Sequence, residues 1–187
     1  VETLKLMHVC RRLDKPTLAT ISCSGGEASL AADTAHGRAL SFPPLSDTQQ
    51  QELFEALGPK VALANPLDYH TYIWRDTERM TDTFAAMAGP ETGITLAIVD
   101  YPHTDASDWI CATEAIIGAH QRTGRPYGVV TTLPELLPPE LAEQFMAAGV
   151  VPFMGLTEAI VAVEAAALHS SVPGTPPLPA GEVVGAV

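Results

Sequence analysis

The sequence predicts an α/β fold in which a five-stranded parallel sheet is covered by helices on both faces. Five short apolar runs recur along the chain, and they are nearly continuous rather than alternating, as strands buried on both faces require. Stretches with helical periodicity separate these runs. With 47% apolar and only 17% charged residues, the 187-residue chain also has the material for a full hydrophobic core, which excludes a disordered protein.

The predicted strands are bounded by residues that interrupt regular structure. The first is entered through Pro16 and left through Gly25 and Gly26, and the last lies between Gly149 and Gly155. In chain order, the expected strands are Thr17–Ser22, Val61–Ala64, Ile94–Asp100, Tyr127–Thr131 and Val150–Met154.

The predicted helices lie between these strands. Pro138 and Pro139 suit the first turn of a helix, where the missing N–H is not needed. Helical spacing is also present at the start of the chain, at Val1, Leu4 and His8. The remaining expected helices are Gly26–Ala35, Asp47–Leu57, Asp76–Ala88, one from Trp109 that stops before Gly124, one from Pro138 to Gly149, and one that begins at Leu156.

Residues 1–170 are therefore expected to form one domain of three-layer α/β/α type. Residues 171–187 are rich in proline and lack periodicity, so we interpret them as a linker or tail. Because helical spacing is under way at Val1, we expect the chain to be a piece of a longer polypeptide with further domains.

The net charge of −12 narrows the range of partners. The chain has 10 Lys and Arg and 22 Asp and Glu, and this excess of negative charge repels a phosphate backbone. We therefore expect no binding to nucleic acid and none to anionic membrane lipid. The apolar runs fall short of the roughly 18 residues that a membrane helix needs. Three widely spaced cysteines and an N-terminus without an export signal predict a cytoplasmic protein without a disulfide framework or structural zinc.

The junction after the first strand is the main candidate for a site, because parallel sheets bind ligands beyond the carboxyl ends of their strands. Ser22, Ser24, Gly25 and Gly26 place small side chains and free N–H groups at a helix N-terminus, which favours an anion. Ser24 followed by Glu27 also matches a capping box, which would satisfy the same amides without a ligand. The residues alone leave both interpretations open.

Two nucleophiles lie at the same junction. Cys23 is either a thiol with a pKa lowered by the helix N-terminus or a small apolar filler. Ser24 lies one residue short of the G-x-S-x-G elbow of hydrolases. The histidines that could serve as its base, His103 and His169, lack the context of a strand end, so we do not expect a hydrolase.

The second and third junctions carry further polar side chains. Asn65 and Pro66 break the second strand and Asp68 can cap the segment after it, so Asn65 and Asp68 form a possible secondary loop of the site. The same loop holds His70, Tyr72 and Trp74. After the third strand come Asp100, His103, Asp105 and Asp108. Their spacing is not diagnostic of a metal and we expect none, with Asp108 capping the next helix.

Three motifs occur here in a characteristic order. Ser24 to Asp33 matches S-G-G-x-x-x-L-A-A-D, Pro44 to Ser46 lie in a P-x-L-S stretch that opens a helix, and Asn65 to Asp68 matches N-P-L/V-D. Together they resemble one domain of the acyl-CoA synthetases that form a nucleoside diphosphate. This family includes acetate–CoA ligase (ADP-forming) and is related to succinyl-CoA synthetase. The similarity covers about residues 1–170.

The resemblance implies a flavodoxin-like domain of a modular enzyme. The other domains of the family bind CoA, carry a phosphohistidine, or have the ATP-grasp fold. These enzymes convert a carboxylic acid, CoA and ATP into acyl-CoA, ADP and phosphate, by way of an acyl phosphate and the phosphohistidine. By resemblance, the turn of Ser22, Ser24, Gly25 and Gly26 begins a helix whose N-terminus faces that phosphohistidine.

This chain also departs from the family in ways that limit the expected activity. The S-H-T-G motif of the phosphohistidine is missing, and so are a G-x-G-x-x-G fingerprint and an ATP-grasp lysine set. We therefore expect no catalytic residue in this chain and no activity from it alone. ATP, Mg²⁺ and CoA are cofactors and substrates of the full-length enzyme rather than of this domain, and an oligomer is compatible with this interpretation.

The alternative is a flavodoxin-like module that binds FMN or another anion and has no ligase activity. The hydroxyl-bearing turn after the first strand would hold a phosphate, and Trp74 with Tyr101 would stack on a flavin. A flavin site would have more hydroxyl side chains where this chain has two adjacent glycines and Glu27, which is evidence against this alternative.

Overall fold

A five-stranded sheet forms the centre of the computed structural model, which describes residues 1–171, with the side chains of residues 1–169. All four strand pairs are parallel, and the strands are ordered β2-β1-β3-β4-β5. This is the order of flavodoxin-like sheets, so the predicted fold class is confirmed. Apart from Ser171, the predicted tail lies outside the described residues. The strands are β1 (Leu18–Ser22), β2 (Leu67–Asp68), β3 (Ile94–Ile98), β4 (Tyr127–Thr131) and β5 (Val151–Met154).

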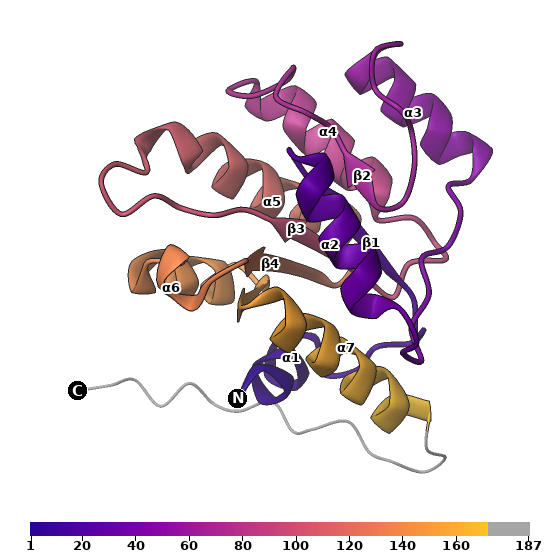
Figure 1. Ribbon diagram of the computed structural model, residues 1–187, viewed down its shortest axis with the longest axis vertical. Helices are drawn as coiled ribbons and strands as arrows, with labels where there is room; N and C mark the ends of the chain where they lie inside the picture. Colours follow the sequence, from indigo (N-terminus) through magenta and orange to yellow (C-terminus); the bar gives the residue numbers. More distant parts are fainter. Residues whose placement is uncertain (172–187) are drawn as a thin grey trace.

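Helices cover both faces of this sheet (Figure 1). One core cluster joins one face of the sheet to α3, α4, α5 and α6, and a second joins the opposite face to α1, α2 and α7. Every residue of β1, β3 and β4 is buried, which explains why these strands have continuous apolar runs. The helices are α1 (Glu2–Cys10), α2 (Gly25–Ala35), α3 (Asp47–Leu57), α4 (Thr77–Met87), α5 (Ile110–Thr123), α6 (Pro139–Ala147) and α7 (Leu156–Ser171). Short 3-10 turns, η1 (Ser107–Trp109) and η2 (Pro134–Leu136), precede α5 and α6. None of the helices in the described part of the chain is long and apolar enough to cross a membrane.

The predicted second strand at Val61–Ala64 is wrong, because the strand that pairs with β1 is β2, a few residues later. Asn65 provides the physical reason. Its side-chain amide donates to the carbonyls of Leu18 and Pro43, and its Oδ1 accepts from the N–H of Thr20. The side chain thus takes the place of a strand at this level of the β1 edge, and backbone pairing starts only at Leu67.

Helix starts follow local capping chemistry in two cases and depart from prediction in a third. Ser46 caps α3 in a complete capping box with Gln49, and Asp76 caps α4 by accepting from the N–H of Arg79 at 3.1 Å. The predicted cap by Asp108 is wrong. This residue lies inside η1 and makes no capping bond, because its carboxylate forms an ion pair with Arg75 instead.

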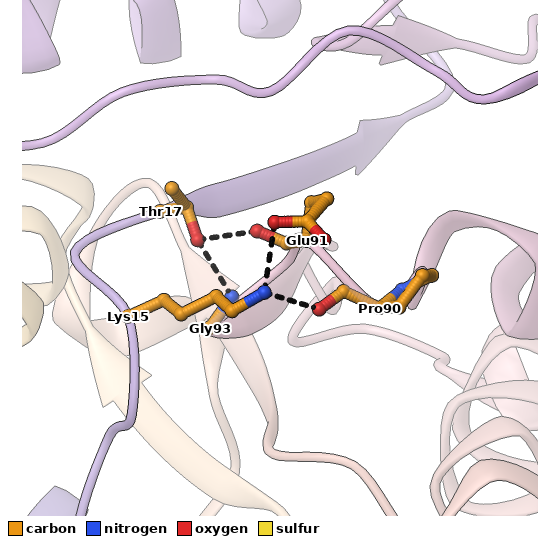
Figure 2. A network of polar contacts seen from close by, with 5 residues as sticks. All are labelled: Lys15, Thr17, Pro90, Glu91 and Gly93. Carbon is orange, nitrogen blue, oxygen red and sulfur yellow. Dashed lines mark hydrogen bonds and ion pairs between the residues drawn. The ribbon is translucent and has the colours of Figure 1, made fainter.

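At the amino end of the sheet, a polar network joins the entrances of β1 and β3 (Figure 2). The Lys15 ammonium group donates to the Pro90 carbonyl and the Glu91 carboxylate, both at 2.8 Å. The Thr17 hydroxyl donates to the Glu91 carbonyl at 2.6 Å and accepts from the N–H of Gly93 at 2.9 Å. The two central strands are therefore fixed at the end opposite to the candidate site.

The N-terminal helix α1 packs beside α7 and against the edge strand β5 (Figure 1). The Lys5 ammonium group donates to the Pro152 carbonyl at 2.6 Å, and the N–H of Met154 donates to Glu2 at 3.3 Å. Lys5 and Glu2 also form an ion pair at 2.7 Å. Side chains of α1 thereby form hydrogen bonds with backbone groups of β5.

Candidate functional site

The N-terminus of α2 lies directly after β1, at the carboxyl edge of the sheet. Ser24 is the N-cap residue with extended backbone (φ −141°, ψ 129°), and Ser24, Gly25 and Gly26 are all exposed. The Ser24 side chain makes no capping hydrogen bond, so the predicted capping box of Ser24 and Glu27 is wrong. In the described part of the chain, the N–H groups of Gly25, Gly26 and Glu27 have no acceptor. The first turn of α2 is therefore open to a ligand.

Ser22 shapes this turn from inside. It is buried, and its hydroxyl donates to the carbonyl of Ser24 at 3.0 Å. That bond holds the chain between the end of β1 and the start of α2. Ser24 is consequently the predicted serine that reaches solvent, whereas Ser22 supports the turn beneath it.

Asp68, the last residue of β2, lies next to this turn. A Cβ placed on Gly25 would lie 3.2 Å from Oδ2 of Asp68. Asp68 caps no helix, because its Oδ1 accepts from the backbone N–H of His70 at 2.8 Å. Its Oδ2 lies 3.5 Å from Nδ1 of His70, close enough for an ion pair when the imidazole is protonated. Asn65, the other predicted residue of this loop, uses its amide for the β1 edge instead.

Asp100 adds a second carboxylate to this edge, just beyond β3. Its two oxygens accept from the N–H and the hydroxyl of Thr132, at 2.7 and 2.6 Å. Thr132 follows β4, so the pair joins the carboxyl ends of two neighbouring strands. Asp100 is thus held in place by neutral donors and has no cationic partner in the described residues.

Glu27 makes no capping contact with Ser24, and the charges of these two carboxylates act on it. Burial, then the charge of Asp100, then that of Asp68, raise the pKa of Glu27 to about 7. The same carboxylates act on Cys23, whose pKa is raised mainly by burial and then by the charge of Glu27. Since Cys23 also packs against the core cluster beneath α3 to α6, it is an apolar filler and not an activated nucleophile.

The remaining polar residues of the third junction are not gathered into a site. Asp105 accepts from the N–H of Ser107, and Asp108 pairs with Arg75. Across residues 1–169, no group of three or more His, Cys, Asp and Glu side chains is arranged to hold a metal ion.

The aromatic residues of the alternative flavin site are also separated. Tyr101 is 1% exposed, and its hydroxyl lies 2.9 Å from that of Thr113. Trp74 contacts Trp109 edge to face, with ring centroids 5.7 Å apart. Tyr101 is inside the core, so the predicted stacking of Tyr101 on a flavin is wrong.

Sequence reasoning missed the grouping of Glu27, Asp68 and Asp100. The signal was present, since Asp68 ends β2, Asp100 follows β3, and the order β2-β1-β3 places both strands beside β1. Without the strand order, three acids far apart in the sequence give no sign that they meet.

Comparisons with known proteins agree on the fold. No family model matches the sequence, and no curated protein matches it either. Among solved structures, PH0766 from Pyrococcus horikoshii OT3 superposes with a TM-score of 0.70 at 20% identity, over 91% of this chain and 40% of that one.

Two further structures are of dinucleotide forming acetyl-coenzyme A synthetase 1 from Ca. Korarchaeum cryptofilum. The complex with phosphate and ADP gives a TM-score of 0.65 at 15% identity, over 91% of this chain and 38% of that one. The apo form gives 0.64 at 16% identity, over 91% and 39%. This chain therefore has the fold of a segment that makes up about two fifths of these larger proteins, and two of the three are synthetases of the kind that its motifs resemble.

Proposed function

We propose that this chain is a domain of an acid–thiol ligase that forms acyl-CoA, ADP and phosphate from a carboxylic acid, CoA and ATP. The N-terminus of α2 stabilises the phosphoryl group carried by a histidine of a neighbouring domain. Domains that bind CoA, carry the phosphohistidine and have the ATP-grasp fold are its partners in a cytoplasmic enzyme, and ATP, Mg²⁺ and CoA bind to those partners. The motifs at residues 24–33, 44–46 and 65–68 and the fold shared with acetyl-coenzyme A synthetase structures support this proposal.

The observation that carries the proposal is the uncapped first turn of α2. A helix N-terminus has roughly half a positive charge, and its free amides point along the helix axis. Gly25 and Gly26 have no Cβ, so a phosphoryl oxygen can approach their N–H groups closely. The Ser24 hydroxyl is exposed beside them. These donors would stabilise an anion most when a partner domain excludes water.

A substitution at Gly26 tests this role in the full-length enzyme. A Cβ on Gly26 would meet only Oγ of Ser24, at 3.5 Å, so the folded domain accepts a side chain there. Gly26→Val places two methyl groups where the phosphoryl group would dock. We expect phosphohistidine formation from labelled ATP to slow by about tenfold or more, which is less than the roughly hundredfold or greater loss on complete removal of an oxyanion donor, because the backbone N–H remains.

Ala32→Val is the matched control, because it introduces the same β-branched side chain in α2 away from its first turn. Ala32→Val lowers helix propensity slightly, whereas Gly26→Val does not, so the control is the more demanding of the two variants for folding. An unchanged rate of histidine phosphorylation in Gly26→Val, with the domain folded, would show that the turn is only the start of a helix.

A further inference from the structure

The helices α5 and α6 cover the same face of the sheet but make little contact with each other. α5 packs closely against α4, and α6 packs against β5. Neighbouring helices normally interlock their side chains, so a gap between two of them leaves apolar groups uncovered. Here the gap at the carboxyl edge of the sheet is a hollow of about 300 Å³. Ile110 and Thr113 line it from α5, and Pro138, Glu140 and Leu141 line it from the start of α6.

A second hollow, of about 580 Å³, adjoins the first. The two share Ala106 and Pro138, so together they form one groove, which we call the α5–α6 groove. The second hollow is lined by residues at the ends of three strands: His103 follows β3, Pro134 follows β4, and Met154 ends β5. The groove therefore runs along the edge at which parallel sheets bind their ligands.

Two large apolar side chains are exposed at this edge. Ile110 in the wall of the groove is 55% exposed, and Leu133, next to Pro134 in the sequence, is 52% exposed. Single exposed apolar residues are common, but an apolar side chain beside an apolar groove enlarges one continuous surface. Covering this surface removes apolar area from water, which favours a partner with a large apolar side chain of its own.

The charge along the groove is negative. Asp105 and Glu135 line the larger hollow, and Glu140 lines the smaller one. Within the described residues, none of the ten Lys and Arg side chains lines either hollow, and the imidazole of His103 is the single basic group there. The groove thus presents three carboxylates without a Lys or Arg beside them.

Another hollow shows that this imbalance is not simply a consequence of the net charge of −12. It has a volume of about 450 Å³ and lies between α3, α4 and α5. Arg79 and Arg122 line it together with three acids, Glu52, Glu55 and Asp82, and Arg122 forms an ion pair with Asp82. Cations inside that hollow offset its acids, whereas the carboxylates of the α5–α6 groove are left for a partner to neutralise. The α5–α6 groove is therefore complementary to a segment that is apolar in its middle and positively charged at its flanks.

Building on the proposed function, we propose that the α5–α6 groove binds a segment of a neighbouring domain of the same enzyme, and that this segment carries a large apolar side chain flanked by Lys or Arg. The apolar side chain packs between Ile110 and Leu141, and the cations reach the three carboxylates. The groove lies along the same edge of the sheet as the N-terminus of α2. A domain docked in the groove is therefore brought towards the first turn of α2, where it helps to exclude water.

Photo-crosslinking in the full-length enzyme tests this contact. Ile110 is replaced by the photoreactive residue p-benzoylphenylalanine, and after irradiation the captured peptide is identified by mass spectrometry. We expect position 110 to capture a segment outside residues 1–187 that contains a large apolar residue with Lys or Arg close by on either side. Phe54 is the matched control position, because it is 54% exposed, lies in α3 and does not line the groove. The same replacement at Phe54 should not capture this segment.

Reversal of charge tests the electrostatic part of the proposal. Glu140→Lys should lower the crosslinking yield from position 110 by about threefold or more, because an attraction becomes a repulsion. Glu143→Lys is the control, since this glutamate is also exposed on α6 but does not line the groove. Glu140 lies in the first turn of α6, where a lysine also weakens the helix. Glu135→Lys, in η2, is therefore the second variant and should lower the yield in the same way.

The outcomes of these experiments separate the groove from the proposed function. The inference is wrong if position 110 captures nothing, a segment without Lys or Arg, residues 172–187, or a second copy of this chain. Equal yields from Glu140→Lys, Glu135→Lys and Glu143→Lys would also overturn it. None of these results bears on histidine phosphorylation, which Gly26→Val tests separately. Capture of the expected segment together with unchanged phosphorylation in Gly26→Val would support the groove and refute the role of α2.

Discussion

The side-chain amide of Asn65 donates a hydrogen bond to the Leu18 carbonyl at 3.1 Å, across the outer edge of β1. The same nitrogen donates to Pro43, and Oδ1 accepts from Thr20. One side chain therefore satisfies three backbone groups, two in β1 and one at Pro43, at the place where β2 is too short to reach.

Asn65→Asp tests how much these bonds stabilise the fold. The substitution is nearly isosteric and keeps the acceptor for Thr20, but it turns both donor contacts into repulsion between oxygens. We expect the free energy of unfolding to fall by about 2–4 kcal/mol, because two partly buried carbonyls lose their donor and a charge is placed beside them. Urea denaturation measures this. A change below about 0.5 kcal/mol would show that water replaces the amide without cost.

Gly93 and Gly26 form a contrasting pair for alanine substitution. A Cβ on Gly93 would lie 2.2 Å from the Lys15 carbonyl oxygen and 2.8 Å from that of Thr17, in the network of Figure 2. Gly93→Ala must separate the entrances of β1 and β3, so we expect a loss of about 3 kcal/mol or more. Gly26→Ala meets no such obstacle in α2 and should stabilise the chain by about 0.5–1 kcal/mol. Thermal or chemical unfolding of both variants compares them; equal stabilities would contradict the contact at Gly93.

The dependence of stability on pH should carry the signature of Glu27. Its pKa is raised in the folded state, from an ordinary value of 4.5 to about 7. Between these values the unfolded chain loses the proton while the folded chain keeps it, so the stabilising contribution is complete below about pH 4.5 and is lost as pH rises towards 7. Glu27→Gln lacks this loss. Between acidic and alkaline pH, we expect the free energy of unfolding of Glu27→Gln to rise by about 1–2 kcal/mol relative to that of the wild type. This figure is reduced for the exposed part of the side chain.

Unfolding in urea at a series of pH values measures this difference between Glu27→Gln and the wild type. A difference that stays constant across pH would mean that Glu27 is ionised with its ordinary pKa in the folded chain.

The isolated chain should not form acyl-CoA from acetate or another carboxylic acid, CoA and ATP, whereas the full-length enzyme should. The reason is chemical: the chain contains no S-H-T-G histidine and no set of residues for holding ATP. Production of CoA thioester by each protein, followed with a thiol reagent that detects free CoA, makes the comparison. Turnover by residues 1–187 alone would refute the assignment to one domain of a larger ligase.

Four of the five strands could be predicted from the sequence, because strands buried on both faces require nearly continuous apolar residues. The prediction of Tyr127–Thr131 coincides with β4, and those for β1, β3 and β5 contain the observed strands. The two-residue edge strand β2 could not be predicted in this way. The run Val61–Ala64 has the composition of a strand, but pairing with β1 depends on where Asn65 binds Leu18 and Thr20, and this is a long-range contact.

The candidate site shows the same division between local and long-range chemistry. The glycine-rich turn and the start of α2 could be predicted from local spacing, and α2 begins at Gly25, one residue before the predicted start. The capping box of Ser24 and Glu27 is also a local pattern, yet it does not form. The charges of Asp68 and Asp100 act on Glu27 instead, and only the strand order brings these residues to the same edge.

The contacts between α1 and β5 have a consequence for self-association. An exposed strand edge presents unpaired N–H and C=O groups that can recruit a strand from another molecule. Lys5 and Glu2 occupy the Pro152 carbonyl and the Met154 N–H on one edge, and β2 keeps the other edge to two residues, Leu67 and Asp68. Within the described residues, the sheet therefore offers little template for strand addition from either side. Contacts between this domain and another protein would therefore form through side chains and loops rather than by pairing of strand edges.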